Sequence, residues 1–572
     1  MESRVDRGSL GFCLMMGALL VGLYLPFIDK AFHIDDYYVL AFSQMLGFNP
    51  LHAEATEYYY MGGQTSGFTP YQDNSPLLIP YVVKLLSAVF GASERALHTA
   101  FLVFPAISLA SLVWLNRTLF PAATNAQREV SRTIPLFILS APAFMVNSQN
   151  LMRDVPALSF LLLALASFAA YIERGRVPMA LLGGGSLALA ILTQYPPLAF
   201  VPVIAVYALL RKKLNVWMGL GLLLPLAVLF GLLTASYGLL DKLAQVKEGG
   251  LEAQHSLWWL ADPGRFWGEL PAKVMSLLAH LGASTVFVIL AHLCLRRPRP
   301  YQLSVLGLFA LFAYVVSGEV SDYGVPSRVL LAAASAVGAF ALCETTIRAL
   351  ARVEGRRSPG EAFLLLWVFT LAVCLVVLFP LGSARYILPL LPPVVLVMLN
   401  APLPAAELRR PQRVVLYACL GSSLLFGVAS AYSDYEHADD YRRFAADVKR
   451  IKESAAEPFD VWYISEWGMR HYMDEAGARY LPSYSNEPRE GDVVVMTGMS
   501  RHWGPSPLIA DRLQLFDHRE YDSAFPLRLF HTPSNAGFYG HYWGLLPFSF
   551  SRLPHEVFDI YVVSDRAPNV YR

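Results

Sequence analysis

Charged residues are scarce in this 572-residue chain, because Asp, Glu, Lys and Arg make up only 16% of it. A soluble protein carries about a quarter of its residues as charges. Hydrophobic residues make up 55% of the chain and lie in long blocks. Blocks of this length are typical of helices that cross a membrane. The formal net charge is +1, so the composition gives no reason to expect a nucleic-acid partner.

Cysteine is rare, and several functional motifs are missing. The five cysteines all lie inside apolar blocks without a Cys-x-x-Cys pair, so we expect small buried side chains rather than disulfides or a cysteine-ligated metal. The sequence has no P-loop, no glycine-rich dinucleotide fingerprint and no Gly-x-Ser-x-Gly elbow. These absences remove support for ATP-driven transport, redox chemistry and α/β-hydrolase chemistry. The cysteines are Cys13, Cys294, Cys343, Cys374 and Cys419.

Apolar segments of spanning length follow one another with short polar joints. This pattern predicts a polytopic α-helical membrane protein with about 13 transmembrane helices. Arg4 and Arg7 precede the first block and no small-x-small cleavage site follows it, so we expect a retained anchor. The predicted spans are 10–28, 96–119, 134–150, 156–172, 178–194, 196–210, 214–239, 271–294, 301–317, 326–350, 361–381, 385–400 and 413–432.

Lys and Arg gather in every second joint, and the joints between them are richer in acid. If the chain lies in a plasma (inner) membrane with its N-terminus in the cytoplasm, all the basic joints fall on the cytoplasmic side, as the positive-inside rule requires. The domain that follows the last span then lies outside, in the periplasm or the extracellular space. The basic joints contain Arg4, Arg7, Arg117, Arg128, Arg132, Arg174, Arg176, Arg211, Lys212, Lys213, Arg296, Arg297, Arg299, Arg348, Arg352, Arg356, Arg357, Arg409, Arg410 and Arg413.

Residues 1–432 form the predicted transmembrane module, and 433–572 form a small extracytoplasmic α/β domain. The first outer loop, 29–95, contains a short apolar piece from Pro76 to Phe90 that we expect to lie along the membrane interface. In the C-terminal domain, apolar periodicity predicts helices and short buried strands. The predicted helices are 438–452 and 467–476, and the predicted strands are 459–464, 492–496 and 557–563.

Two adjacent carboxylates, Asp35 and Asp36, come directly after the first apolar block. A carboxylate can act as a general base on a hydroxyl or amine nucleophile, or it can bind a metal. Adjacent aspartates also cap helices. Beside a membrane helix we favour the functional interpretation, because buried charges there are costly and mark functional sites.

Two further outer joints carry charges that could meet the Asp pair. Arg153-Asp154-Val155-Pro156 is either a local salt bridge or a helix start at which Asp154 points into the same cleft. Arg385 heads an otherwise apolar span, with Tyr386 next to it. Its side chain could simply snorkel to the headgroups, but a guanidinium fork also suits the phosphate of a lipid.

Two weaker candidates complete the set. Asp73, in Asp73-Asn74-Ser75-Pro76, and His255 could share a divalent ion, although a hydrogen-bonded histidine is the alternative. His541 and Trp543 in the C-terminal domain could touch a substrate or pack against the membrane part.

Several short segments share their order and sidedness with a known family. They are the acidic pair Asp35-Asp36, Phe90-Gly91 before Glu94-Arg95-Ala96-Leu97, Arg153-Asp154-Val155-Pro156-Ala157, Leu192-Thr193-Gln194-Tyr195-Pro196 and Ala384-Arg385-Tyr386-Ile387-Leu388-Pro389. Together, over residues 10–430, they resemble the GT-C membrane glycosyltransferases. The branch that they resemble is the group of protein O-mannosyltransferases and lipid A aminoarabinose transferases.

The resemblance implies transfer of a sugar from a polyprenyl-phosphate-linked donor to an unidentified acceptor on the outer face of the bilayer. It implies inversion, with Asp35 as the catalytic carboxylate beside Asp36, Asp154 as a second acid and Arg385 on the carrier phosphate. We also expect Tyr386, Arg153, Asn74 and Tyr195 to bind substrate. No cofactor is required, and a divalent metal ion at Asp73 and His255 is an option.

The sequence also departs from this family. The Lys of an acid-Lys-Pro-Pro run is absent at Asp73-Asn74-Ser75-Pro76, and a central Lys is absent near Gln194. These departures argue against assigning the same donor or acceptor. The alternative function is a polytopic transporter, or a flippase for a lipid-linked sugar without transfer chemistry.

Overall fold

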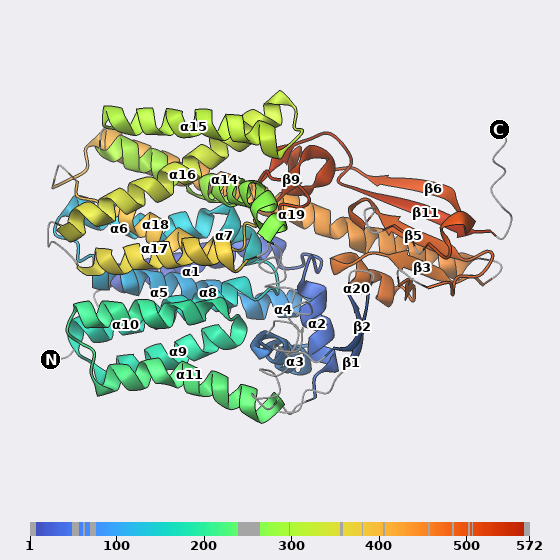
Figure 1. The fold of residues 1–572 in the computed structure, drawn as a ribbon, viewed down its shortest axis with the longest axis horizontal. Coiled ribbons are helices and arrows are strands. Elements are labelled where there is room, and N and C mark those ends of the chain that lie inside the picture. Colours follow the sequence, from blue (N-terminus) through green and yellow to red (C-terminus); the bar gives the residue numbers. More distant parts are fainter. Residues whose placement is uncertain are drawn as a thin grey trace.

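Helices make up most of the molecule, and a smaller domain that contains a β-sheet lies at one end of the helical body (Figure 1). Among the residues described, seven helices are long and apolar enough to cross a membrane, so we treat the chain as a multi-pass membrane protein. The computed structural model describes residues 7–47, 56–60, 63–68, 76–237, 263–296, 298–354, 359–379, 381–403, 406–455, 458–482, 485–500, 504–505 and 507–564.

Each predicted span overlaps a helix or a pair of short helices in the structure. Six more apolar helical stretches outside the set of seven are 10–17 residues long, so the count of about 13 crossings stays a prediction. The helices of the body are α1 (Arg7–Tyr24), α5 (Val103–Leu119), α6 (Asn125–Ser140), α7 (Pro142–Asn147), α8 (Asp154–Arg174), α9 (Val177–Thr193), α10 (Phe200–Leu210), α11 (Val216–Tyr237), α14 (Pro263–Arg296), α15 (Pro300–Val320), α16 (Val325–Glu354), α17 (Pro359–Val377), α18 (Leu391–Leu399) and α19 (Arg410–Ser454).

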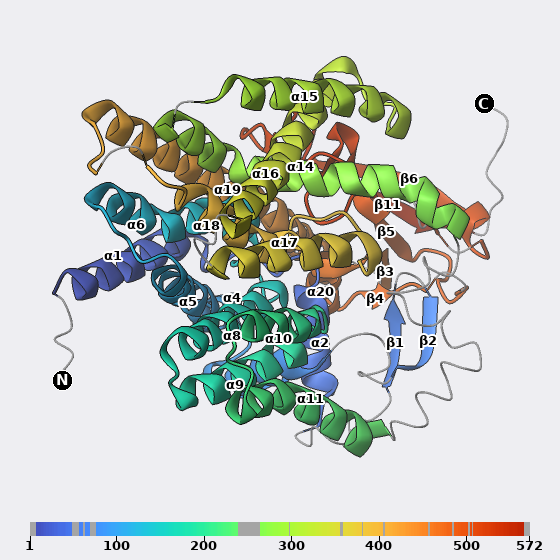
Figure 2. The ribbon, with the colours of Figure 1, turned by 60° about the vertical axis from the view of Figure 1, so that its left-hand side comes forward.

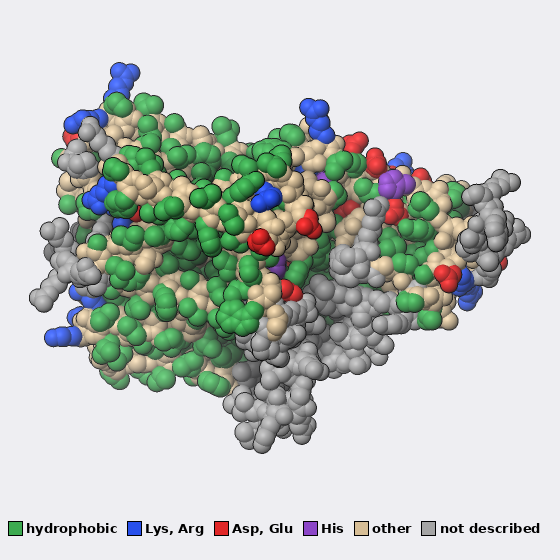
Figure 3. Space-filling model, turned by 45° about the horizontal axis from the view of Figure 1, so that its top comes forward, with side chains coloured by type: hydrophobic (Ala, Val, Ile, Leu, Met, Phe, Trp, Pro, Cys, Tyr) green, Lys and Arg blue, Asp and Glu red, His purple; other side chains and the backbone are tan. Residues whose placement is uncertain are grey.

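Basic joints that are distant in sequence meet at one end of the helical body. Arg413 Nε donates to Glu129 at 3.1 Å, which joins the starts of α19 and α6. Arg211 Nε donates to Glu173 at 2.9 Å, which joins the ends of α10 and α8. On the face in Figure 3, several Lys and Arg side chains stand at this left-hand end, and apolar side chains cover the body. Basic side chains from several predicted inner joints therefore gather at one end of the body, whereas the placement of this end relative to the cytoplasm stays a prediction.

Two predicted spans differ in their bounds from the helices in the structure. The predicted span 134–150 starts earlier, because Thr124 and Gln127 form a capping box before α6, and it breaks at Pro142, where α7 begins. The predicted span 385–400 starts later. Residues 381–387 form turns, Leu388–Leu390 form the 3₁₀ helix η3, and α18 follows. Arg385 therefore lies in a loop and not at the head of a helix.

Helix α19 joins the body to the C-terminal domain. It is one continuous helix of 45 residues, about 68 Å long at 1.5 Å per residue. This is roughly twice the thickness of a hydrocarbon core. The predicted boundary at 432/433 and the predicted helix 438–452 both lie inside α19.

The C-terminal domain contains a five-stranded sheet in the order β4-β3-β5-β11-β6. The predicted strands are confirmed as β3 (Val461–Ile464), β5 (Val493–Thr497) and β11 (Glu556–Val563), and the predicted helix as α20 (Trp467–Glu475). β3 pairs in parallel with β5 and with β4 (Arg479–Tyr480), whereas β11 is antiparallel to its neighbours. The edge strand β6 (Leu513–Tyr521) was not predicted, because five of its nine residues are polar and its sequence has no buried apolar run.

The first outer loop folds on the same side as the C-terminal domain (Figures 1 and 2). Its described elements are α2 (Asp36–Met45), β1 (Thr56–Tyr60), β2 (Gly63–Phe68), α3 (Leu78–Phe90) and α4 (Glu94–Phe101). The apolar piece from Pro76 to Phe90 forms α3, and its position relative to a membrane stays a prediction.

Sidedness can be tested with single cysteines after the five natural cysteines are replaced. Arg176, between α8 and α9, and Glu319, near the end of α15, are both exposed, and they are predicted to lie on opposite sides of the membrane. We expect a membrane-impermeant maleimide to label Glu319→Cys in intact cells, and Arg176→Cys only after permeabilisation. The reverse pattern, or equal labelling of both in intact cells, would refute the orientation.

Candidate functional site

Three loops at the end of the body beside the C-terminal domain bring charged side chains together. Asp35 precedes α2, Asp154 begins α8, and Arg385 lies between α17 and η3. Arg385 Nη1 donates to Asp35 in an ion pair that joins residues 350 positions apart. Asp154 accepts a hydrogen bond from Gln194 Nε2 at 3.0 Å. The structure therefore brings together three charged residues that were predicted to share one cleft.

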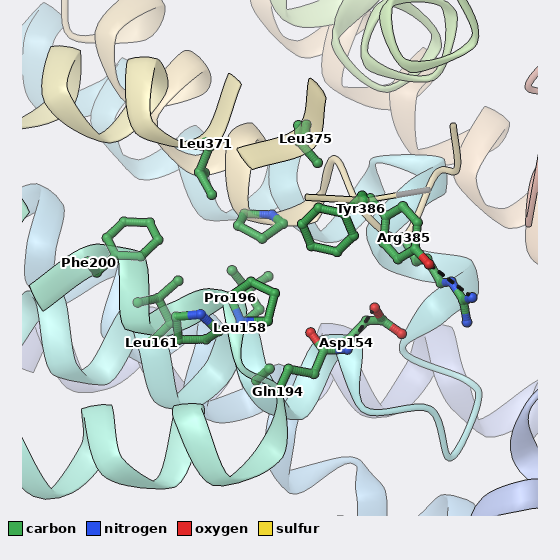
Figure 4. Close-up of a pocket in the computed structure, with 14 residues that line it drawn as sticks. Asp154, Leu158, Leu161, Gln194, Pro196, Phe200, Leu371, Leu375, Arg385 and Tyr386 are labelled. Atoms are coloured by element: carbon green, nitrogen blue, oxygen red, sulfur yellow. Dashed lines mark hydrogen bonds between the residues drawn. The ribbon is translucent and has the colours of Figure 1, made fainter. Parts of the chain in front are cut away.

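A cavity with about 470 Å³ of empty space, part of it open to solvent, starts at Asp154 and Arg385 and continues between α8, α10 and α17. In Figure 4, Asp154 and Gln194 face Tyr386 and Arg385 across one end, and apolar side chains form the rest of the wall. The cavity thus has a charged mouth and an apolar interior. The apolar lining residues are Ala157, Leu158, Leu161, Pro196, Pro197, Phe200, Leu371, Leu375, Phe379 and Pro389.

Arg385 keeps an unused hydrogen-bond donor at this mouth. Its Nη1 holds Asp35, its Nη2 donates to Tyr386 Oη at 3.4 Å, and its guanidinium lies 5.1 Å from the centre of the Tyr386 ring. Within the described part of the chain, its Nε has no hydrogen-bond partner. A buried guanidinium N–H without an acceptor is costly, so an anion at this position would complete the bonding of Arg385.

Two other predicted residues flank the mouth. Arg153 is half-buried and interacts electrostatically with Asp154, Asp35 and Arg385. Tyr195 is half-buried, and the charge of Arg153 acts on its hydroxyl. Arg153 therefore adds a second positive charge near the mouth, where Asp35 and Asp154 supply two negative charges.

Asp36 lies elsewhere, although it is the neighbour of Asp35. Its side chain is fully buried, and its two carboxylate oxygens accept backbone N–H bonds from His33 at 3.0 Å and Leu151 at 2.7 Å. Burial raises the pKa of Asp36 to about 7, and Lys30 and the two N–H donors act in the opposite direction. These contacts fix the loop before α2 to the loop before α8. They favour a positioning role over the predicted direct catalytic role.

The residues that hold the loops were not predicted. Lys30 Nζ binds Asp434 and Asn150, and the side chains of Lys30 and Asp434 are 0% and 1% exposed. The only signal in the sequence was the position of Lys30 and Asp434 just beyond the first and last predicted spans. Charges at such positions are common at membrane interfaces, and nothing local shows that two of them pair.

The remaining predicted residues either lie outside the described part of the chain or have packing and hydrogen-bond partners in the C-terminal domain and its neighbours. Asp73, Asn74 and His255 lie outside the described residues. Among the residues that are described, no group of three or more His, Cys, Asp or Glu side chains could hold a metal ion. His541 Nδ1 accepts a hydrogen bond from Gly382 N, and Trp543 packs on Trp467 and Phe530 with ring centres 5.2 and 5.1 Å apart.

Comparison with known proteins gives one family match. Residues 74–237, which are 164 of the 572 residues, match the model of the dolichyl-phosphate-mannose-protein mannosyltransferase family. This stretch contains Asp154, Gln194 and the α8 and α10 walls of the cavity. No curated protein matches the chain in sequence.

Solved structures give remote likenesses. ArnT from Cupriavidus metallidurans bound to undecaprenyl phosphate is 13% identical, with 89% of this chain and 96% of ArnT covered and a TM-score of 0.39. Archaeal oligosaccharyltransferase AglB from Archaeoglobus fulgidus, in complex with an inhibitory peptide and a dolichol-phosphate, is 14% identical, with 82% and 63% covered and a TM-score of 0.43. Arabinosyltransferase EmbB from Mycobacterium smegmatis is 15% identical, with 78% and 44% covered and a TM-score of 0.34.

Likenesses of this size place no residue and carry no conclusion about function. The family match, in contrast, agrees with the resemblance to the protein O-mannosyltransferase group over residues 74–237.

Proposed function

We propose that this protein transfers a sugar from a polyprenyl-phosphate carrier to an acceptor on the outer face of the membrane. The observation that carries the proposal is the cavity with a charged mouth, which includes the guanidinium of Arg385, and an apolar interior. A polyprenyl-phosphate sugar has the matching shape and chemistry, because an anionic head follows a long apolar tail. The match of residues 74–237 to a family named for dolichyl-phosphate-mannose supports this class of donor.

Arg385 binds the carrier phosphate in this proposal. Its Nη1 is held by Asp35, whereas its Nε is free within the described residues to donate to a phosphate oxygen. As the sugar–phosphate bond breaks, negative charge grows on the departing phosphate. A guanidinium fixed at that position stabilises the transition state more than the ground state.

Asp35 is the base. Its side chain is 29% exposed, so an acceptor hydroxyl or amine can reach it from the aqueous side. The acceptor gives its proton to Asp35 and attacks the anomeric carbon on the face opposite the phosphate. The bond from that carbon to the phosphate oxygen breaks, and the phosphate keeps the electron pair. A single displacement of this kind inverts the anomeric centre.

The apolar part of the cavity takes the first isoprene units of the carrier. Its walls come from α8, α10 and α17, and the buried residues Leu161 and Leu371 lie on two of these helices. Burial of each methylene contributes about 0.8 kcal/mol. The tail therefore supplies much of the donor affinity, and the charged mouth supplies its orientation.

The base is tested by comparing the two neighbouring aspartates. We expect Asp35→Asn to lower transfer by about 10²–10⁴-fold, the usual worth of a general base, while the protein keeps its thermal stability in detergent. In Asp36→Asn, the NH₂ group of the new amide faces one of the two buried backbone N–H groups, which then has no acceptor. This lowers the stability by roughly 1–3 kcal/mol. This variant therefore unfolds at a lower temperature.

The measurement is transfer from a labelled polyprenyl-phosphate sugar, with thermal unfolding of both purified variants alongside. Turnover of Asp35→Asn within tenfold of the wild type would remove Asp35 as the base. Translocation of the labelled lipid by the wild type without transfer to any acceptor would replace the transferase with the flippase alternative.

The tail site is tested by narrowing the cavity. Ala157 lines it on α8 and is 4% exposed. We expect Ala157→Phe to raise the KM for a full-length carrier at least tenfold, and to change the KM for a carrier cut to one isoprene unit less than twofold. An equal effect on both carriers would show that the tail lies outside this cavity.

A further inference from the structure

One short segment of the C-terminal domain touches all the loops that carry the charged site. The segment Phe538–His541 lies between the loop of Arg385 and the polar cluster of Lys30. Phe538 O accepts hydrogen bonds from Ala384 N at 2.9 Å and Ser383 Oγ at 3.3 Å. The loop that carries Arg385 is thus bonded to this segment immediately before the arginine.

His541 adds a third bond to the same loop. Its Nδ1 lies 3.0 Å from Gly382 N, which can only donate, so Nδ1 accepts. Burial lowers the pKa of His541 to about 4. The imidazole is therefore neutral near pH 7, and its Nδ1 keeps the lone pair that this bond needs.

Tyr539 bonds directly to the loop before α8, and it reaches the loop of Asp35 through Asp434 and through its ring, whose centre lies 5.7 Å from that of His33. Its hydroxyl donates to Asp434 Oδ2 at 2.8 Å and accepts from Asn150 Nδ2 at 3.1 Å, and the side chain is 2% exposed. Asp434 and Asn150 both bind Lys30. Asn150 comes three residues before Arg153, and Lys30 comes five residues before Asp35. One hydroxyl thus ties the loop of the proposed base to the loop that begins α8.

The same domain holds the loop of Asp35 from another direction. Phe32 N donates to Tyr472 Oη of α20 at 2.7 Å. A Cβ atom on Gly468 would lie 2.2 Å from Phe32 O, so a larger residue would push α20 away. Between these contacts and Asp35, Ile34 has φ +48°, a region that β-branched residues occupy only where their surroundings impose it.

We propose that Phe538–His541 is the positioning element of the active site and that Tyr539 is its central positioning residue. This inference rests on the proposed function. The C-terminal domain is then a part of the transfer machinery, because it sets where the base and the phosphate ligand stand. His541 fixes the loop of Arg385, and Tyr539 fixes the loops of Asp35 and Arg153.

The test uses two tyrosines from the same stretch. Tyr539→Phe removes the buried hydroxyl, whereas Tyr542→Phe removes a hydroxyl that donates to Glu269 from a side chain that is 49% exposed. We expect Tyr539→Phe to lower kcat at least tenfold, with a donor KM within threefold of the wild type. Tyr542→Phe keeps kcat within twofold. Equal kcat values for the two variants would overturn the proposal.

A second readout needs no transfer reaction. Hydrogen–deuterium exchange of the unliganded protein reports on the backbone bonds directly. We expect Tyr539→Phe to speed exchange at least tenfold in peptides covering 30–36 and 148–153, with β5 and β11 unchanged. Absence of transfer by the wild type would contradict the proposed function. The hydrogen–deuterium exchange of the two peptides would still show whether Tyr539 positions these loops. Unchanged exchange in both peptides would overturn it.

His541 offers a rescue test for the loop of Arg385. His541→Leu loses the acceptor, and we expect faster exchange at residues 381–385 and at least a tenfold higher donor KM. His541→Asn places an amide oxygen near the position of Nδ1, so exchange and KM return to within threefold of the wild type. Identical behaviour of the Leu and Asn variants would show that the hydrogen bond to Gly382 has no positioning role.

Discussion

The end of the helical body beside the C-terminal domain depends on the buried ion pair between Lys30 and Asp434. Both side chains are almost fully buried, and removing two charges from water costs several kcal/mol for each ion. Asn150 and Tyr539 supply the hydrogen bonds that make such a pair tolerable. The pair fixes the chain after α1 to α19, and its partners fix the loop before α8 and the C-terminal domain to both. The candidate site stands on this arrangement.

An apolar cavity and a partly exposed carboxylate lie next to each other in this structure. The carboxylate of Asp35 and the guanidinium of Arg385 form a pair at the end of the helices, where water can enter, and the cavity behind them is apolar. Because α19 continues into the C-terminal domain without a break, that domain is connected to the body by a rigid element. A domain held in this way can set the position of loops, which a flexibly linked domain could not do.

The sequence predicted most helices and the charged residues at their ends, but it did not predict the side-chain contacts that join one loop to another. Apolar blocks and alternating basic joints predicted the helical body. The sidedness of the joints, together with the resemblance, predicted that Asp35, Asp154 and Arg385 share one cleft. The pairing of Lys30 with Asp434 joins residues 404 positions apart and leaves no local pattern. Asp36 was grouped with Asp35 because the two are adjacent, but successive side chains at a helix start point about 100° apart. Asp36 therefore faces the interior while Asp35 faces the cleft.

The most direct test of the central claim is a cryo-electron microscopy structure with a bound polyprenyl-phosphate analogue. We expect a phosphate oxygen at hydrogen-bond distance, about 3 Å, from Arg385, and the polyprenyl tail between α8, α10 and α17. A phosphate bound away from Arg385, or a tail on the outer surface of the helical body, would contradict it.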